Sequence, residues 1–282
     1  MTPPSVTPVR PPATMAFDRL APDYDALTGG EIFQRLRRRT HTVLARRFAA
    51  GARVLEIGCG TGADTVFLAS RGTRVVACDP SEEMVSRSLR RVAREKLDDR
   101  VSVLPCGLSD LASFLDALAE PAGFDGIISN FGALNCVESL APLGALARRY
   151  LRPSGVIVLG LMSRVCALEV IYFTATRRRN LARRRQRPGA VCVPVAGVEV
   201  PTFYHRIRDV RAALGPELAL LSIEGVGVAI PPPYLEPRWQ RLPVSVRSAV
   251  AQVDALLAPW PPFNRIGDHV LLVFAKRKDR HA

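Results

Sequence analysis

Short apolar runs alternate with amphipathic stretches along the first half of the chain. The β-rich runs occupy residues 52–58, 74–79, 101–105, 126–130 and 155–162. Between them, the spacing of apolar residues predicts helices at about 32–50, 63–70, 81–96, 109–119 and 140–150. Strands that are apolar on both faces, joined by helices, are typical of a parallel sheet covered on both sides.

This alternation stops after Met162. A helix is expected from about Val165 into an arginine-rich segment, followed by a hairpin that turns at Ala196-Gly197 and a helix at 208–214. Two last strands, at 218–228 and 269–277, flank a proline-rich helical insert. The prediction is an α/β fold with a doubly wound, seven-stranded, mostly parallel sheet whose last strand is antiparallel.

The expected organisation is one domain from residue 15 to 282 after a disordered tail at 1–14. The segments 163–207 and 231–264 interrupt the core pattern and are predicted to form a cap over the site. The tail has five prolines and no apolar run, so it resembles neither a signal peptide nor an anchor. No run of 18 uncharged apolar residues occurs, so a membrane-spanning helix is not expected.

The clearest chemical signal is VLEIGCGTGAD at 54–64, where an apolar strand enters a glycine-rich turn and a helix begins at once. Glycines at such a turn let the backbone approach a ligand at the helix N-terminus. The next strand ends in Asp79, which is placed to accept hydrogen bonds from a ribose diol.

These residues resemble the class I S-adenosylmethionine-dependent methyltransferases. The resemblance rests on the E-x-G-x-G-x-G motif, on CDPSEEM at 78–84 and on FDGIISNFGALN at 124–135. The FDRLAPDYD segment at 17–25 is similar to the quinone and small-molecule branch. The resemblance to the methyltransferases covers roughly residues 17–162 and the last strand pair, and it implies S-adenosylmethionine as the cofactor.

The resemblance also implies roles for individual residues. Glycines of the loop would pack against the methionine part of the cofactor, Glu56 would order the loop, and Asp79 would bind the ribose. The third strand lacks the acid that many relatives use for the adenine amine, so backbone groups there would supply that contact. The implied cofactor-binding residues are Tyr24, Glu56, Gly58, Cys59, Gly60, Gly62, Asp79, Pro80, Met84, Gly107, Leu108, Asn130 and Phe131.

A nicotinamide dinucleotide site is the alternative, because Gly58, Gly60 and Ala63 satisfy a loose G-x-G-x-x-[GA] pattern. Glu56 inside the strand, the third glycine at Gly62 and the terminal strand pair favour the methyl donor.

The net charge of +13 invites a nucleic-acid hypothesis, but the charge is concentrated in one segment. Residues 139–198 hold eleven arginines and one acid, Glu169, which gives +10. The cluster at 177–187 lacks interleaved aromatic residues, so binding of nucleic acid is not expected. A solvated helix face is the first interpretation, and contact with an anionic membrane surface or an acidic substrate is the second.

Six cysteines show no C-x-x-C pair and no histidine at ligand spacing. They indicate reduced thiols of a cytoplasmic protein, with no metal site.

Candidates for acceptor chemistry are few, and each has an alternative. Glu169 is the one acid on an apolar helix and is either a base or an ion-pair partner. Tyr204 and His205 lie at the end of the hairpin and are either site residues or a surface pair. His269 opens the last strand as a base or as a histidine bonded to Asp268. His41 lies among arginines and is interpreted as solvated.

The predicted function is methyl transfer to a small molecule, such as a quinone or natural-product intermediate, with the acceptor atom (O, N, C or S) left open. One alternative is an RNA or protein methyltransferase that docks through 177–187. The other is a regulatory protein that binds the cofactor without chemistry.

Overall fold

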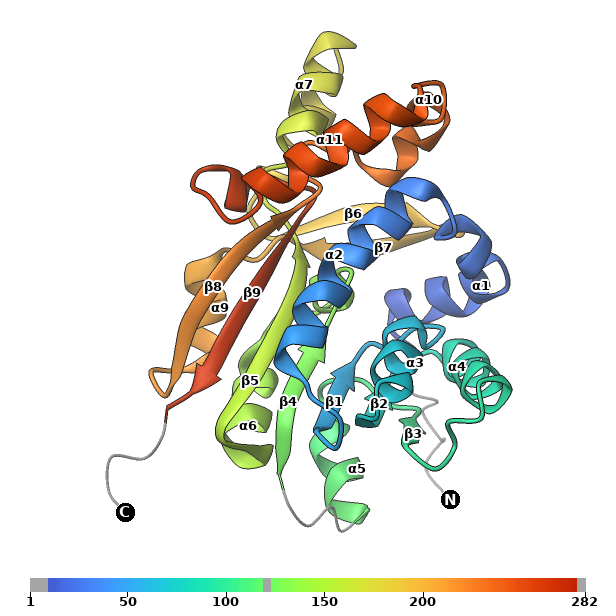
Figure 1. The fold of residues 1–282 in the computed structure, drawn as a ribbon, viewed down its shortest axis with the longest axis vertical. Coiled ribbons are helices and arrows are strands. Elements are labelled where there is room, and N and C mark those ends of the chain that lie inside the picture. Colours follow the sequence, from blue (N-terminus) through green and yellow to red (C-terminus); the bar gives the residue numbers. More distant parts are fainter. Residues whose placement is uncertain (1–9, 119–122, 278–282) are drawn as a thin grey trace, which may run out of the picture.

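The computed structural model describes residues 10–118 and 123–277 (Figure 1). One sheet contains β1 (Arg53–Ile57), β2 (Arg74–Cys78), β3 (Val101–Leu104), β4 (Phe124–Ser129), β5 (Leu151–Met162), β8 (Leu218–Val226) and β9 (His269–Lys276). Their order is β3-β2-β1-β4-β5-β9-β8. The first five strands pair in parallel, and β9 runs antiparallel to β5 and β8. The predicted fold class is confirmed.

Helices cover both faces of this sheet. On one face a hydrophobic core joins the strands to α5 (Leu111–Ala117), α6 (Ala141–Tyr150) and α9 (Ile207–Leu214). On the other face a second core joins them to α2 (Glu31–Arg47), α3 (Ala63–Ser70) and α10 (Glu236–Trp239). The helix α4 (Glu82–Arg94) packs beside α3 and β3.

The remaining elements gather beyond the carboxyl ends of the parallel strands (Figure 1). They are α1 (Pro12–Leu27), α7 (Ala167–Ala175), α8 (Arg179–Ala182), the hairpin of β6 (Ala190–Val195) and β7 (Val198–Phe203), α11 (Val244–Leu257), and the 3-10 turns η1 (Ala133–Cys136), η2 (Arg184–Gln186), η3 (Pro233–Leu235) and η4 (Phe263–Arg265). No helix in the described part of the chain is both long and apolar enough to cross a membrane.

Two expectations about local structure are wrong. The helix expected from Val165 into the arginine cluster ends at Ala175, because Arg177 adopts a left-handed backbone (φ 58°) that an α-helix of L-residues does not continue. The expected tail is also too long. Residues 1–9 lie outside the described part, but Pro12–Thr14 begin α1, with proline in the first helical turn where its missing N–H costs nothing.

Gly126 in β4 shows how closely α2 packs on the sheet. The ring of Phe48, at the end of α2, covers this position, and a Cβ built on Gly126 would lie 2.1 Å from Phe48 Cε1. Both residues belong to the centre of the molecule, where neighbours cannot move away cheaply.

We therefore expect Gly126→Ala to lower the free energy of unfolding by about 1–3 kcal/mol through overpacking. Chemical denaturation followed by circular dichroism measures the change. Gly107→Ala is the matched control, because the nearest atom to its new Cβ is Pro80 Cβ at 3.7 Å. Equal stability of the two variants would contradict the prediction.

Candidate functional site

The glycine-rich loop leaves β1 and turns sharply into α3. Gly62 has a φ of 79° and its missing Cβ makes room for Ser88, whose Oγ would lie 2.4 Å away. Gly60 also has a positive φ, of 54°, but a Cβ there would meet no atom within 4 Å. Gly62 is therefore required by packing, whereas Gly60 borders open space where a ligand can approach the backbone.

Asp79 ties the end of β2 to this loop. Its Oδ2 accepts a hydrogen bond of 2.9 Å from the Gly60 N–H, and its Oδ1 accepts one of 2.9 Å from the Ser81 N–H. Burial raises the pKa of Asp79 to about 6, and the two backbone donors limit the rise. The carboxylate thus lies beside the open face of Gly60, as the sequence predicts.

Glu56 lies inside the protein rather than at the open face. Its Oε2 accepts a hydrogen bond of 2.5 Å from the Thr65 hydroxyl on α3. Burial, together with the nearby charge of Asp64, raises the pKa of Glu56 well above its usual value. Glu56 therefore joins β1 to α3 below the loop, which is the ordering role implied for it.

Asp64, in the first turn of α3, is a site residue that the sequence did not reveal. Its Oδ1 lies 2.7 Å from His41 Nε2, and its Oδ2 accepts a hydrogen bond of 2.7 Å from Asn130 Nδ2. Burial alone would raise the pKa of Asp64, but the bonds and charge of His41 and the charge of Arg37 lower it. The interpretation of His41 as solvated is wrong, because this ring also stacks on Phe67 at 3.7 Å.

Asn130 and Phe131 follow β4, at the edge of the site next to α2 and β9. Phe131 has a left-handed backbone (φ 48°), and its N–H donates to Asn130 Oδ1 at 3.0 Å. The Phe131 ring packs on Phe33 of α2 at 4.7 Å and meets His269 edge-on at 5.6 Å. Strained backbone of this kind persists where surrounding contacts hold it, and it concentrates at functional sites.

The helix α1 closes the outer side of the site. Asp25 Oδ1 accepts a 2.7 Å hydrogen bond from the Thr61 hydroxyl of the loop, and Arg91 of α4 donates to Asp25 Oδ2 at 2.6 Å. Asp18 accepts a 2.7 Å bond from Ser81. Burial raises the pKa of Tyr24 to about 12, and the charges of Arg37, Asp64 and Asp79 act on the same hydroxyl. The Tyr24 hydroxyl is therefore buried near Asp64 and Asp79.

The residues implied for the adenine side gather at the ends of β2 and β3. Met84 is buried, and its N–H donates to Ser81 Oγ at the start of α4. Pro80 lies next to Gly107, and Leu108 is buried behind them. Cys59 is buried in the loop, and a Cβ on Gly58 would lie 2.3 Å from Ala133 Cβ. Met84, Pro80, Gly107 and Leu108 thus lie around the ends of β2 and β3, whereas Gly58 packs on Ala133 beyond the end of β4.

Glu169 is engaged in a buried ion-pair cluster. Arg185 Nη2 lies 2.6 Å from Glu169 Oε2 and 2.6 Å from Asp268 Oδ1, and Arg184 Nε lies 3.0 Å from Glu169 Oε1. Burial alone would raise the pKa of Asp268, but Arg185 and His269 hold it far below its usual value. The carboxylates of Glu169 and Asp268, which lie close to the Cys166 thiol, thus hold the Arg185 guanidinium between them. A solvated helix face is wrong for this part of the arginine cluster.

The two hairpin candidates also have internal partners. His205 Nε2 lies 3.0 Å from the carbonyl oxygen of Val137 and 3.2 Å from that of Leu134, which fastens the hairpin to η1. Tyr204 is buried, and the Arg185 guanidinium lies 5.7 Å from its ring centre. Among the four acceptor-side candidates, His269 has its ring against Phe131 at the site, and its Nδ1 lies 3.1 Å from Asp268 Oδ2.

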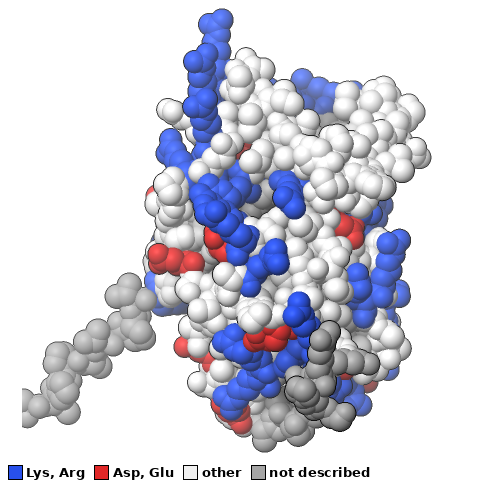
Figure 2. Space-filling model, turned by 90° about the vertical axis from the view of Figure 1, so that its left-hand side faces the viewer, with Lys and Arg blue, Asp and Glu red and all other residues white. Residues whose placement is uncertain are grey.

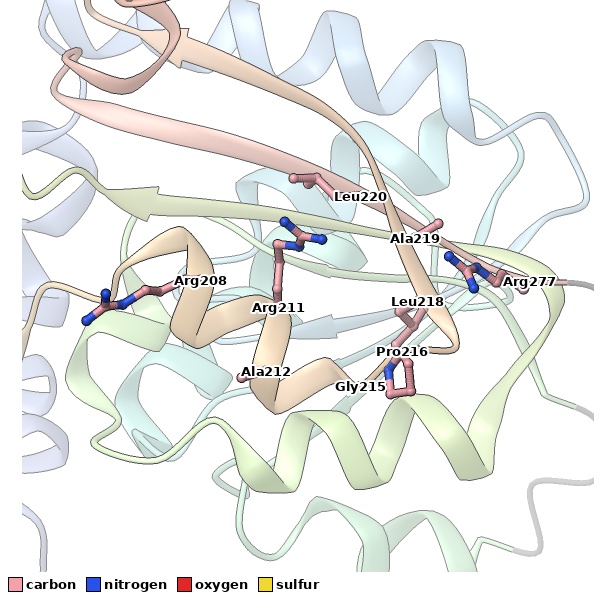
Figure 3. Close-up of a pocket in the computed structure, with 9 residues that line it drawn as sticks. All are labelled: Arg208, Arg211, Ala212, Gly215, Pro216, Leu218, Ala219, Leu220 and Arg277. Atoms are coloured by element: carbon pink, nitrogen blue, oxygen red, sulfur yellow. The ribbon is translucent and has the colours of Figure 1, made fainter.

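A surface hollow lies away from the site, between α9 and the edge strand β8. Three arginines, Arg208, Arg211 and Arg277, line it with apolar residues. Figure 3 shows that the guanidinium of Arg208 points away from the other two, so the three charges do not converge on one point. The hollow also contains none of the predicted site residues, so the strand ends remain the candidate site.

Comparison with known proteins agrees with this geometry. Residues 54–155 match the model of a methyltransferase domain. A demethylmenaquinone methyltransferase from Clavibacter sepedonicus is 37% identical over 121 residues, which are 43% of this chain and 45% of that protein. A tRNA 5-carboxymethoxyuridine methyltransferase from Escherichia coli K12 is 29% identical over 86 residues, 30% of this chain and 33% of that one. The chain thus matches less than half the length of these relatives.

The solved structure of the [4+2]-cyclase SpnF is similar to this chain, with a TM-score of 0.60 and 16% identity. The similarity covers 95% of this chain and 96% of the SpnF chain. At this level of identity the likeness shows the fold alone.

We expect Arg185→Met to lower the free energy of unfolding by about 3–5 kcal/mol near neutral pH, because two buried carboxylates lose their shared cation. In the native protein the lowered pKa of Asp268 contributes stability above the carboxyl's ordinary pKa. This contribution is lost as the pH falls towards the lowered pKa that Asp268 has in the folded protein. In the variant it is absent.

In the variant Asp268 lacks this cation and can take up a proton as the pH falls towards about 4, so the deficit of the variant should shrink there. Urea denaturation at several pH values measures it. Arg183→Met, at an exposed neighbouring position, is the matched control. A deficit that stays constant with pH would contradict this account of the cluster.

Proposed function

We propose that this chain, whose residues 54–155 form a domain of the class I S-adenosylmethionine-dependent methyltransferase family, transfers a methyl group to a small-molecule acceptor. The observation that carries the proposal is the pairing of Asp79 with the open face of Gly60 at 2.9 Å, between the ends of β1 and β2. A carboxylate next to accessible backbone at this point of a doubly wound sheet suits a ligand with a ribose diol.

The residues present fit S-adenosylmethionine. Asp79 would hold the ribose, the Gly58–Gly62 loop would lie along the methionine part, and Met84 and Leu108 would supply the apolar edge for the adenine. When bound, the sulfonium supplies an activated methyl group. The chain's own task is to align the acceptor and to exclude water, which α1 does on the outer side through Asp25 and Asp18.

The acceptor would enter between Phe131 and the cap. Aromatic side chains of α7 and η3, which belong to the predicted cap segments, pack together: Tyr172 and Phe173 lie 6.4 Å and 5.9 Å from Tyr234, measured between ring centres. Such surfaces favour a partly apolar molecule, such as a quinone or natural-product intermediate. The similarity to a demethylmenaquinone methyltransferase supports the same class.

His269 is the residue that we assign to proton removal from the acceptor. Its ring borders Phe131, and the Asp268 carboxylate beside Nδ1 would hold the tautomer that leaves Nε2 as the base. Glu169 and Tyr204 would act through Arg185, which fixes Asp268, and His205 would hold the hairpin in place. These three are positioning residues in this proposal.

The arginine-rich segment gives less support to an RNA or protein acceptor. Arg184 and Arg185 are turned towards Glu169, so only part of the cluster at 177–187 remains for docking. A binding isotherm with a mixed tRNA preparation at low and high salt separates the alternatives, since phosphate contacts make affinity strongly salt-dependent.

For the donor site, we expect Asp79→Asn to weaken S-adenosylmethionine binding roughly 10- to 100-fold, because charged hydrogen bonds to the ribose are lost. Isothermal titration calorimetry measures the dissociation constant. Asp110→Asn, on an exposed carboxylate at the start of α5, is the matched control. Unchanged affinity in Asp79→Asn, or no binding to the native chain, would refute the donor proposal.

The pH dependence of the same binding should follow the ionisation of Asp79. Its pKa is raised to about 6, so below that pH a growing fraction of the carboxyl is protonated and can no longer accept two hydroxyl donors. We expect the affinity of the native chain to fall as the pH drops below about 6. In Asp79→Asn this fall should be absent.

For proton removal, we expect His269→Gln to lower the initial rate of methyl transfer at least ~100-fold while leaving S-adenosylmethionine affinity nearly unchanged. Transfer is measured with labelled S-adenosylmethionine and a fractionated small-molecule extract. His205→Gln is the comparison variant and should instead lower the melting temperature, because it releases the hairpin from η1. Full activity in His269→Gln would overturn this assignment.

A further inference from the structure

Helix α11 turns its apolar face towards solvent. The helix and its flanking residues expose six apolar side chains, which are spaced alternately four and three residues apart. They are Leu242, Val246, Ala249, Val253, Leu256 and Trp260. Leu256 is 70% exposed, Val253 46% and Trp260 67%. Surface helices of water-soluble proteins ordinarily place such a stripe on the core side.

The charged residues of α11 face the protein instead. Its two charged side chains are Arg247, which pairs with Glu31 at the start of α2, and the buried Asp254, whose Oδ1 accepts hydrogen bonds of 2.8 Å from Ala229 and 3.2 Å from Ile230 backbone N–H groups. The helix is therefore fixed in this orientation by ionic and hydrogen-bonded anchors. Its outward apolar face is a property of the folded protein.

The neighbouring surface carries positive charge without acidic partners. Arg177, Arg178, Arg179, Arg183 and Arg187 are exposed, and among the described residues none of them forms an ion pair. Glu169, the one acid of that segment, is already bound to Arg184 and Arg185. Contacts of Tyr172 and Phe173 with Tyr234 bring α7 against η3, which leads into α10 and α11.

Both surfaces therefore lie at one end of the molecule. Figure 1 shows α7 and α11 together at the top, and Figure 2 shows blue side chains there beside a broad area without charge. The exposed Ile171 on α7, and Arg238 and Arg241 before α11, extend the same combination of apolar and basic residues.

We propose that this end of the molecule docks on an anionic lipid surface, with the outer face of α11 in the headgroup region and the arginines of 177–187 on lipid phosphates. Charge decides between the available occupants. A second copy of the chain carries the same net +13, so its overall charge repels the exposed arginines. An anionic bilayer supplies both the apolar layer and the negative charge.

The two tryptophans of the chain provide a built-in test. Trp260 is 67% exposed beside α11, whereas Trp239 is 3% exposed in the core. The full chain is titrated with vesicles of phosphatidylcholine containing a minority of phosphatidylglycerol, and with pure phosphatidylcholine vesicles. We expect the emission of Trp260 to shift to shorter wavelength with the anionic vesicles, and the shift to be absent in Trp260→Phe.

Vesicle flotation then measures affinity in matched variants. We expect Val253→Ser with Leu256→Ser, and separately Arg177→Gln with Arg178→Gln and Arg179→Gln, each to weaken binding roughly tenfold or more. Leu221→Ser, at an exposed position on β8, should bind like the native chain. High salt should weaken native binding.

Circular dichroism checks that each variant is folded, and titration of S-adenosylmethionine checks that the donor site is intact. Absence of any anionic-vesicle binding by the folded native chain overturns the proposal. So does sedimentation showing a dimer that Leu256→Ser separates while vesicle binding is unaffected, because α11 would then be an interface between copies.

Discussion

The site depends on the point at which the sheet reverses its order. From β1 the chain moves outwards to β2 and β3, then returns to the other side of β1 as β4. The connections after β1 and β4 therefore leave the sheet in opposite directions, and a crevice opens between their carboxyl ends. The glycine loop, Asp79 and Phe131 all lie at that edge because they follow the carboxyl ends of β1, β2 and β4, respectively.

Three acidic residues share this crevice, and their environments separate their protonation. Burial and the charge of Asp64 favour the neutral form of Glu56, whereas Asp64 stays charged because His41 and Asn130 bind it. Asp79, with two backbone donors, has a pKa of about 6 and lies at the open face of Gly60. Two acids therefore hold the scaffold together, and the third is available to a ligand.

The features predicted correctly from the sequence are those that residues close together in the chain determine. Strand periodicity and the glycine pattern placed the sheet, the loop and Asp79, because turn geometry and alternation are local properties. Contacts between distant segments could not be read in this way. Arg185 meets Asp268 across 83 residues, and His41 meets Asp64 across 23, so both looked like solvated basic residues. The break at Arg177 and the first turns of α1 were missed because tertiary packing outweighs local propensity there.

Helix α2 connects the donor site with the exposed end of the molecule. At its start, Glu236 of α10 accepts hydrogen bonds from the backbone N–H groups of Glu31 and Ile32, at 2.9 Å and 2.8 Å, and Arg247 of α11 pairs with Glu31. Nearly three turns further on, His41 binds Asp64 beside the glycine loop. Helix α2 is therefore the element that contacts both α11, at the exposed end, and α3, at the crevice, although the two surfaces share no residue.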